Sequence, residues 1–273
     1  MTNADEQLVQ TDVTSSGEAR PEVPVVAAYL ILSHKDTSQV ERLIATIRNS
    51  SPHCHVFVSH DDRVSPPPAE ADSRVHVRSH GAQTDWASWE LVAQTLRAFS
   101  WVHRTVHPDL VVLISGQCYP ARPLAAWEHE FISRGGGWLG TAVPLRYRPR
   151  WGRRRGVGHD DLIHYTYRWY RVPPALERLF KPLNRFRAAL ALRFEPVFSV
   201  RKIGRGGGVY HGIRRIKTPF GPGHDCYKGW QWLAMDSGLL AYITEELRPT
   251  KPLYEYYRRS LVADESLIQT ALS

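Results

Sequence analysis

The stretch VVAAYLIL (25–32) decides how the rest of this 273-residue sequence folds. An unbroken apolar run of this length is typical of a strand that is buried on both faces. The polar segment SHKDTS (33–38) follows, and residues 36 to 38 offer N-cap side chains for a helix that closes near Asn49. That helix carries an i, i+3, i+4, i+7 apolar stripe, made of Val40, Leu43, Ile44 and Ile47.

The same alternation of apolar runs and helical stripes continues along the chain. Further strands are predicted at 55–59, 74–78, 110–115, 137–143 and 226–235. Further helices are predicted at 89–99, 124–133, 236–247, 253–260 and from Asp264 onward. We therefore expect an α/β fold with a mostly parallel central sheet and helices on both of its faces.

The chain divides into a short tail and one large domain. Residues 1–22 are polar and predict a flexible tail, and residues 23–273 are long enough for a single core. The middle of the domain is less regular. There we expect a helix over 176–192 and a glycine-rich basic loop over 201–217.

Composition excludes several classes of protein. Lys and Arg number 35 against 27 Asp and Glu, which gives a net charge of +8, and 42% of the residues are hydrophobic, as in a globular protein. No apolar run approaches the roughly 20 residues of a membrane helix, and the N-terminus does not resemble a secretory signal. Three cysteines fit neither a disulfide framework nor a zinc site. We expect a cytoplasmic protein.

Polar clusters follow three of the expected strands. They are SHKD (33–36), HDDR (60–63) and SGQCYP (115–120). Because α/β sheets bind ligands beyond the carboxyl ends of their strands, these clusters predict a shared site that includes His34. Asp61 and Asp62 raise the alternative of a metal site, but adjacent residues of an extended segment point to opposite faces, and no Asp-x-Asp occurs. The residues favour one carboxylate that accepts hydrogen bonds from a base or ribose.

Two further charged segments allow more than one interpretation. The stretch RYRPRWGRRR (146–155) suits a solvated surface, a phosphate backbone or contact with a membrane surface, while Asp160 and Asp161 are expected to form local ion pairs with it. No nucleic-acid-binding motif accompanies the arginines, so we expect no nucleic-acid partner. In ADES (263–266), Asp264 is expected to cap the last helix, which places Glu265 in its first turn.

Five segments together resemble the core 2/I-branching β-1,6-N-acetylglucosaminyltransferase and peptide O-xylosyltransferase family. They are AYLILSHKDTSQVERLIATI (28–47), VFVSHDDR (56–63), TDWASWELV (84–92), LVVLISGQCYPARPL (110–124) and the region from CYKGWQWLAM to LVADESLIQTAL (226–272). The resemblance spans about residues 25–273 and is closest to the soluble bacterial branch. It implies a GT-A fold, a UDP-sugar donor, inversion at the anomeric carbon and no metal or other cofactor, which agrees with the missing Asp-x-Asp.

The resemblance also implies roles for individual residues. Glu265 corresponds to the catalytic base, Asp61 to the acid that holds the nucleotide, and Thr84, Asp85 and Trp86 to a segment that lines it. Gln231, Trp232 and Asp264 correspond to the acceptor side of the site. The family continues past the base into a basic segment that neutralises the diphosphate. Here that role falls to a basic residue of the middle region, or the chain is a fragment; the candidates are Arg214, Arg215, Arg201, Lys202, Arg205 and Lys217.

The expected function is therefore an inverting, metal-independent glycosyltransferase. It would move GlcNAc, or as a second choice xylose, from a UDP-sugar to a hydroxyl group of a glycan or another acceptor. Two alternatives remain: a non-catalytic basic module that binds anionic polymers, and a degenerate, inactive transferase. The sugar, the acceptor, the linkage and the oligomeric state are not determined by the sequence.

Overall fold

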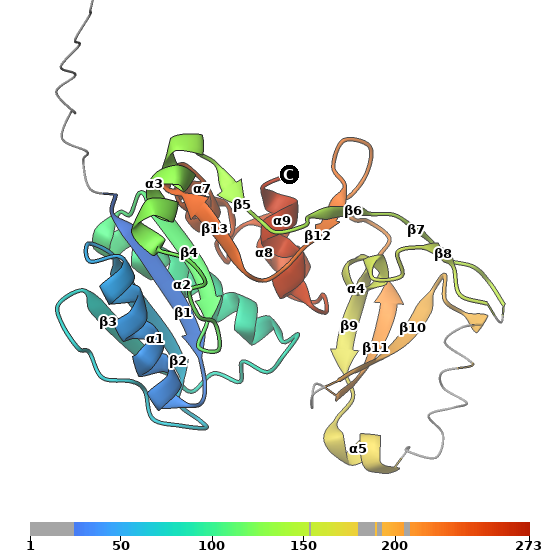
Figure 1. The fold of residues 1–273 in the computed structure, drawn as a ribbon. Coiled ribbons are helices and arrows are strands. Elements are labelled where there is room, and N and C mark those ends of the chain that lie inside the picture. The colour runs from blue at the N-terminus through green and yellow to red at the C-terminus, as the bar shows by residue number, and fades with distance from the viewer. Residues whose placement is uncertain (1–24, 153, 180–188, 190–192, 205–207) are drawn as a thin grey trace, which may run out of the picture.

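A six-stranded sheet is the centre of the computed structural model, which describes residues 25–152, 154–179, 189, 193–204 and 208–273 (Figure 1). In spatial order its strands are β3 (Val75–His80), β2 (His55–Asp61), β1 (Ala27–Ser33), β4 (Leu110–Ser115), β13 (Leu233–Asp236) and β5 (Gly137–Trp138). The first four run parallel, and β13 runs antiparallel to both β4 and β5. The expected α/β class and the mostly parallel sheet are confirmed.

Helices cover both faces of this sheet, because the residues of each buried strand alternate between two apolar clusters. Ala28 and Leu30 face one cluster, whereas Tyr29 and Ile31 face the other. The first face is covered by α2 (Trp89–Val106), α7 (Ser237–Glu246), α8 (Pro252–Tyr257) and α9 (Leu267–Ala271). The second face is covered by α1 (Thr37–Ser50) and α3 (Leu124–Arg134). Of the expected caps for α1, Asp36 is the one used: its side chain accepts from the Gln39 N–H.

The parallel register brings the carboxyl ends of three strands to the same edge. Ser33 at the end of β1 pairs in register with His60 of β2, and Leu32 pairs with Ser115 at the end of β4. The polar segments that follow these strands therefore start side by side, as a ligand site at this edge requires.

The middle of the chain forms a second, smaller sheet, which lies beside the main one in Figure 1. Its strands are antiparallel, in the order β10 (Phe198–Ile203), β11 (Gly208–Arg214) and β9 (Tyr167–Arg171). The expected loop over 201–217 was wrong, because much of it forms the end of β10 and all of β11, which pair with each other, and β11 also pairs with β9, a partner distant in sequence. Of the expected helix over 176–192, α5 (Pro174–Leu179) is described, and most of the remainder lies outside the described residues.

Several short elements join the two sheets. They are β6 (Val143–Leu145), β7 (Tyr147–Arg148), β8 (Val157–Gly158), α4 (Leu162–Thr166) and β12 (Cys226–Lys228). The strand expected over 226–235 is in fact two strands, because β12 pairs with β6 whereas β13 joins the main sheet. The strand expected over 137–143 likewise divides into β5 and β6. These divisions leave residues 229–232 as a loop at the edge of the sheet.

The C-terminal region differs from the expected single helix. A one-turn 3₁₀-helix, η2 (Ala263–Glu265), precedes the separate helix α9. The tail expected over 1–22 lies outside the described residues. Among the helices in the described ranges, none has the combination of length and apolar character that crossing a membrane requires.

Candidate functional site

A cavity of about 620 Å³ lies at the carboxyl ends of β1, β2 and β4, and we call it the strand-end cavity. The fold brings seven of the predicted site residues to its wall: His34, Asp61, Thr84, Asp85, Trp86, Gln231 and Trp232. Asp61 is the last residue of β2, the other four of the first five come from the segments after β1 and β3, and the last two come from the loop before β13. The polar clusters that the sequence places at successive strand ends therefore meet at one cavity.

Asp61 is a buried charged group of the strand-end cavity, and hydrogen bonds hold its carboxylate in place. It ends β2, it is 2% exposed, and its two carboxylate oxygens accept four hydrogen bonds. Arg63 donates through Nε at 2.8 Å, through Nη2 at 2.6 Å and through its backbone N–H at 3.2 Å, and Thr84 Oγ1 donates at 2.7 Å. Burial raises the pKa of Asp61, but the hydrogen bonds from Arg63 and Thr84 outweigh it and hold the pKa well below its usual range.

Two cations that sequence analysis did not select also line this cavity. Arg63 forms an ion pair with Asp61, and its Nη2 lies 3.7 Å from Asp85 Oδ1. Lys35 extends from the turn that follows β1. Both belong to the clusters SHKD and HDDR that the sequence singled out, so their position at the strand ends was the available signal. The strand-end cavity thus contains its own source of positive charge.

Three histidines lie in or beside the strand-end cavity, and burial affects two of them. Burial, and then the positive charge of Lys35, lowers the pKa of His34. Burial also lowers the pKa of His80, and the Nδ1 atom of His80 is buried without a hydrogen-bond partner. His60 has a structural role, since its Nδ1 lies 2.8 Å from Ser33 Oγ and its Nε2 lies 2.8 Å from the Ser65 carbonyl oxygen.

Asp61 and Asp62, the two adjacent acids at the end of β2, do not both line the strand-end cavity. Asp61 lines the strand-end cavity, whereas Asp62 is exposed and does not line it. Within the ranges that the structure describes, no three His, Cys, Asp or Glu side chains gather in a way that would hold a metal ion.

Glu265 belongs to a second cluster of charges, together with Lys228 and Asp161. Lys228 directly precedes the 229–232 loop, which carries Gln231. Lys228 Nζ donates to Asp161 Oδ2 at 2.6 Å and lies 3.3 Å from Glu265 Oε2. Burial lowers the pKa of Lys228, but its pairing with Asp161 and Glu265 outweighs burial and raises the pKa overall. Glu265 is a quarter exposed and is not among the residues that line the strand-end cavity.

Asp264 does not cap a helix, contrary to the sequence prediction. Val262 occupies the N-cap position of η2, Ser266 occupies that of α9, and neither helix has a side-chain cap. Oδ1 of Asp264 is buried without a partner, and burial together with the charge of Glu265 raises the pKa of Asp264 to about 7. Asp264 and Gln231 line one small cavity, and Gln231 also lines the strand-end cavity, so Gln231 separates Asp264 from it.

Strained backbone lies next to the 84–86 segment of the strand-end cavity and next to η2, which carries Glu265. Ala87, directly after Trp86, has a φ of 65°, and Val262, directly before η2, has a φ of 50°. Left-handed backbone costs an L-residue roughly 1–2 kcal/mol, and a β-branched residue such as valine rarely adopts it. Ala87 and Val262 are buried in the same small apolar cluster, whose packing holds both in this conformation.

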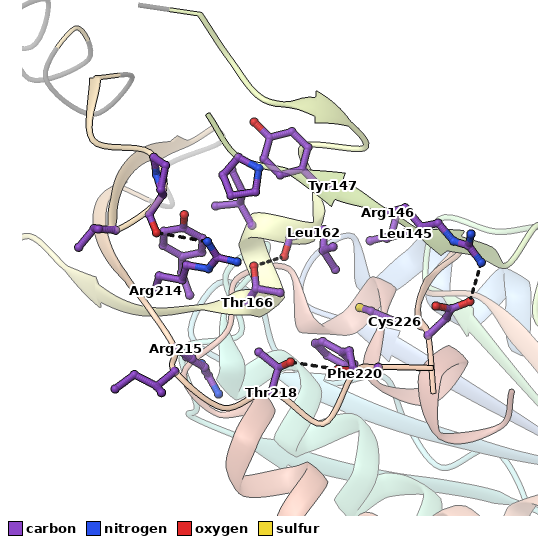
Figure 2. Close-up of a pocket in the computed structure, with 18 residues that line it drawn as sticks. Leu145, Arg146, Tyr147, Leu162, Thr166, Arg214, Arg215, Thr218, Phe220 and Cys226 are labelled. Atoms are coloured by element: carbon purple, nitrogen blue, oxygen red, sulfur yellow. Dashed lines mark hydrogen bonds and ion pairs between the residues drawn. The ribbon is translucent and has the colours of Figure 1, made fainter. Parts of the chain in front are cut away.

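Arg214 and Arg215 are not in the strand-end cavity. They line a different cavity of about 720 Å³, formed by the end of β11, α4 and the segment around Phe220, and Figure 2 shows both at one end of it. Their assignment to the nucleotide-sugar site is therefore corrected. The sequence could not show this, because their position depends on how the second sheet packs. Of the other basic candidates, Arg201 lies 3.7 Å from Asp160, and Arg205 is outside the described residues.

Comparison with protein-family models and with curated proteins finds no match to this chain. Any assignment of function therefore depends on the residues and their geometry.

Proposed function

We propose that the protein is a glycosyltransferase that uses a UDP-sugar, inverts the anomeric carbon and needs no metal ion. GlcNAc is the first choice of sugar, and xylose is the second. One observation carries the proposal: the residues that the sequence assigned to a nucleotide, Asp61, Thr84 and Trp86, line one cavity at the carboxyl ends of parallel strands. This is where open α/β sheets bind nucleotides.

Asp61 has the properties of a group that recognises uridine. A charged, buried carboxylate accepts hydrogen bonds from ribose hydroxyls or from the N–H of a base. Its four lone-pair directions already accept from Arg63 and Thr84, so the nucleotide must replace a donor when it binds. Arg63 is the more exposed partner, with 35% of its side chain accessible. We expect Arg63 to turn away from Asp61 and to meet the diphosphate, together with Lys35.

In the proposed reaction, a carboxylate lies on the acceptor side of the donor sugar and two cations lie on its diphosphate side. The acceptor oxygen forms a bond to the anomeric carbon while the bond from that carbon to the diphosphate oxygen breaks, and Glu265 receives the acceptor proton. Negative charge grows on the leaving UDP, so Arg63 and Lys35 lower the barrier. The acceptor approaches near the 229–232 loop, where the exposed indoles of Trp138 and Trp230 pack edge to face, 6.3 Å apart, as a surface on which a sugar ring can stack.

Calorimetry with UDP in the presence of EDTA tests the donor site. We expect the unmodified chain to bind UDP under these conditions, and Asp61→Asn to weaken binding about tenfold or more, as expected for lost hydrogen bonds to a charged group. Asp62→Asn is the matched control, because its side chain is adjacent but outside the cavity. Equal binding by the two variants would remove Asp61 from the site, and binding lost on chelation would restore the metal alternative.

Mass spectrometry then tests the reaction. The chain is incubated with UDP-GlcNAc, UDP-xylose, UDP-glucose and UDP-galactose, and release of UDP or transfer of the sugar is measured. Turnover with one donor would identify the sugar. UDP binding without turnover of any donor would favour the degenerate transferase.

A further inference from the structure

The cavity of about 720 Å³ that contains Arg214 and Arg215 has no part in the proposed reaction. It lies between the second sheet and the segment that leads into β12, and we call it the second cavity. Arg214 is the last residue of β11 and Arg215 follows it, Thr166 and Tyr167 come from α4 and β9, and Phe220 forms part of the floor (Figure 2). None of the residues that line the strand-end cavity also lines this one.

The positive charge in the second cavity is not balanced. Arg146 lies at the opposite end from Arg214 in Figure 2, and it forms an ion pair with Asp225 at 3.5 Å. In the described parts of the chain, neither Arg214 nor Arg215 meets a carboxylate. Arg214 Nη1 donates to the Pro196 carbonyl oxygen at 3.4 Å, a long hydrogen bond that leaves the rest of its guanidinium unused.

Arg215 is held rigidly at the edge of the same space. Its Nη1 donates to the Tyr256 carbonyl oxygen at 2.7 Å, and its guanidinium stacks on the Tyr256 ring at 3.8 Å. Its Nε is buried and has no hydrogen-bond partner. Burial removes part of the solvent from this guanidinium and so lowers the pKa of Arg215. Guanidinium groups that lack a carboxylate are suited to phosphate, which they bind through paired N–H donors.

Apolar side chains lie around the two arginines at positions that are exposed to solvent, where polar side chains are the usual choice. Ile216, directly after the two arginines, is fully exposed, and Val197, whose carbonyl oxygen accepts from the Arg214 N–H at 2.9 Å, is 52% exposed. Close by, the exposed rings of Trp151 and Phe194 pack edge to face at 6.3 Å. Exposed apolar side chains that gather around a cationic cavity indicate a ligand with both an anionic and an apolar part.

We propose that the second cavity binds a phosphate-bearing amphiphile. The phosphate group lies against Arg214 and Arg215, and the apolar part lies on Ile216, Val197 and Phe220. Such a ligand has two sources, a lipid head group in a membrane or a soluble phosphate ester with an apolar chain. The proposal does not depend on the glycosyltransferase activity.

The ligand arm of the test uses three probes with the unmodified chain. They are glycerol 3-phosphate, dihexanoyl phosphatidic acid below its micelle concentration, and phosphatidylcholine vesicles with and without phosphatidic acid. We expect the soluble amphiphile to bind about tenfold or more tightly than glycerol 3-phosphate. Cosedimentation only with vesicles that contain phosphatidic acid assigns a membrane source, and soluble binding without cosedimentation assigns a soluble ester. Binding to none of the probes, or equal binding of the two soluble ones, would overturn the proposal.

The variant arm locates the ligand. Arg214→Glu is expected to weaken binding of dihexanoyl phosphatidic acid about tenfold or more. Arg97→Glu, an equal charge reversal at an exposed position on α2, is expected to leave it unchanged. Ile216→Ser should weaken binding of the amphiphile but not of UDP. Equal binding by the two charge-reversed variants, or displacement of the amphiphile by UDP, would place the ligand elsewhere and refute the assignment.

Discussion

Lys228 stands directly beside Glu265, with its ammonium nitrogen 3.3 Å from Glu265 Oε2. The same nitrogen donates to Asp161 Oδ2 at 2.6 Å, so one cation joins the proposed base to the residue that precedes α4. The carboxylate of the proposed base is thus fixed in place by a contact between segments distant in sequence.

Glu265→Gln should remove general-base catalysis and little else. We expect kcat to fall about 10²- to 10⁴-fold, while the affinity for UDP stays the same, because the side chain does not line the strand-end cavity. Steady-state kinetics with the sugar found in the donor screen, together with UDP calorimetry, provide the measurement. Glu255→Gln, an exposed glutamate on α8, is the control. A Gln variant with normal kcat would show that another group takes the proton.

Lys228→Met should destabilise the fold by roughly 2 kcal/mol, because it leaves the half-buried carboxylate of Asp161 without its closest donor. Urea unfolding measures this loss. Adding Asp161→Asn to Lys228→Met should recover part of it, since no unpaired charge then remains at that position. Strictly additive losses in the double variant would mean that the two residues do not interact energetically.

Asp264→Asn should increase stability at neutral pH, rather than remove a helix cap. The pKa of Asp264 is raised to about 7, so the folded state holds a proton that the unfolded state releases near pH 4. This bound proton stabilises the folded state at low pH. Its contribution to the free energy of unfolding falls as the pH rises from about 4 to about 7, and above about pH 7 the contribution no longer changes. The variant should therefore gain roughly 1–3 kcal/mol over the unmodified chain between about pH 4 and pH 8.

Urea unfolding of both proteins at several pH values checks this prediction. Asp236→Asn is an informative comparison, because Asp236 does cap α7, where its side chain accepts from the Leu239 N–H. A stability difference between Asp264→Asn and the unmodified chain that does not change with pH would contradict the assigned environment of Asp264.

Tyr29→Phe should destabilise the protein by roughly 2 kcal/mol. The Tyr29 hydroxyl donates to Glu128 Oε1 at 2.5 Å, and Ser51 Oγ donates to Oε2 at 2.9 Å, while Glu128 is only 3% exposed. Removal of one donor leaves a buried carboxyl oxygen unsatisfied. Thermal unfolding of this variant, compared with Tyr242→Phe at an exposed position, measures the effect. A loss no larger than that of the control would show that water replaces the missing hydroxyl.

Local patterns predicted much of the main sheet and its helices. The apolar run at 25–32 covers all of β1 except its last residue, Ser33, and the stripe from Val40 to Ile47 is the buried face of α1. The same patterns failed for 201–217, where glycines and basic residues suggested a loop although β10 and β11 form there. β11 pairs with β10 and also with β9, which is distant in sequence, and no local pattern encodes the pairing with β9.

The residues of the candidate site likewise include some that the sequence predicted and others that it did not. The sequence placed Asp61 and Thr84 in one site, and they meet through a 2.7 Å hydrogen bond. It missed Arg63, whose role depends on a turn that brings its guanidinium back onto Asp61. It misplaced Arg214 and Arg215, because the packing of the second sheet directs them to another cavity.

The sequence by itself therefore determined which segments are buried strands and helices, and which polar residues follow the strand ends. Apolar periodicity and strand-end position are properties of neighbouring residues, so they can be seen in the chain directly. Only the tertiary structure decided that Lys228 lies between Asp161 and Glu265, and that Asp264 is buried without a cap. Ion pairs and desolvation depend on distances between residues far apart in sequence and on the water that packing excludes, and neither is fixed until the sheets and helices have assembled.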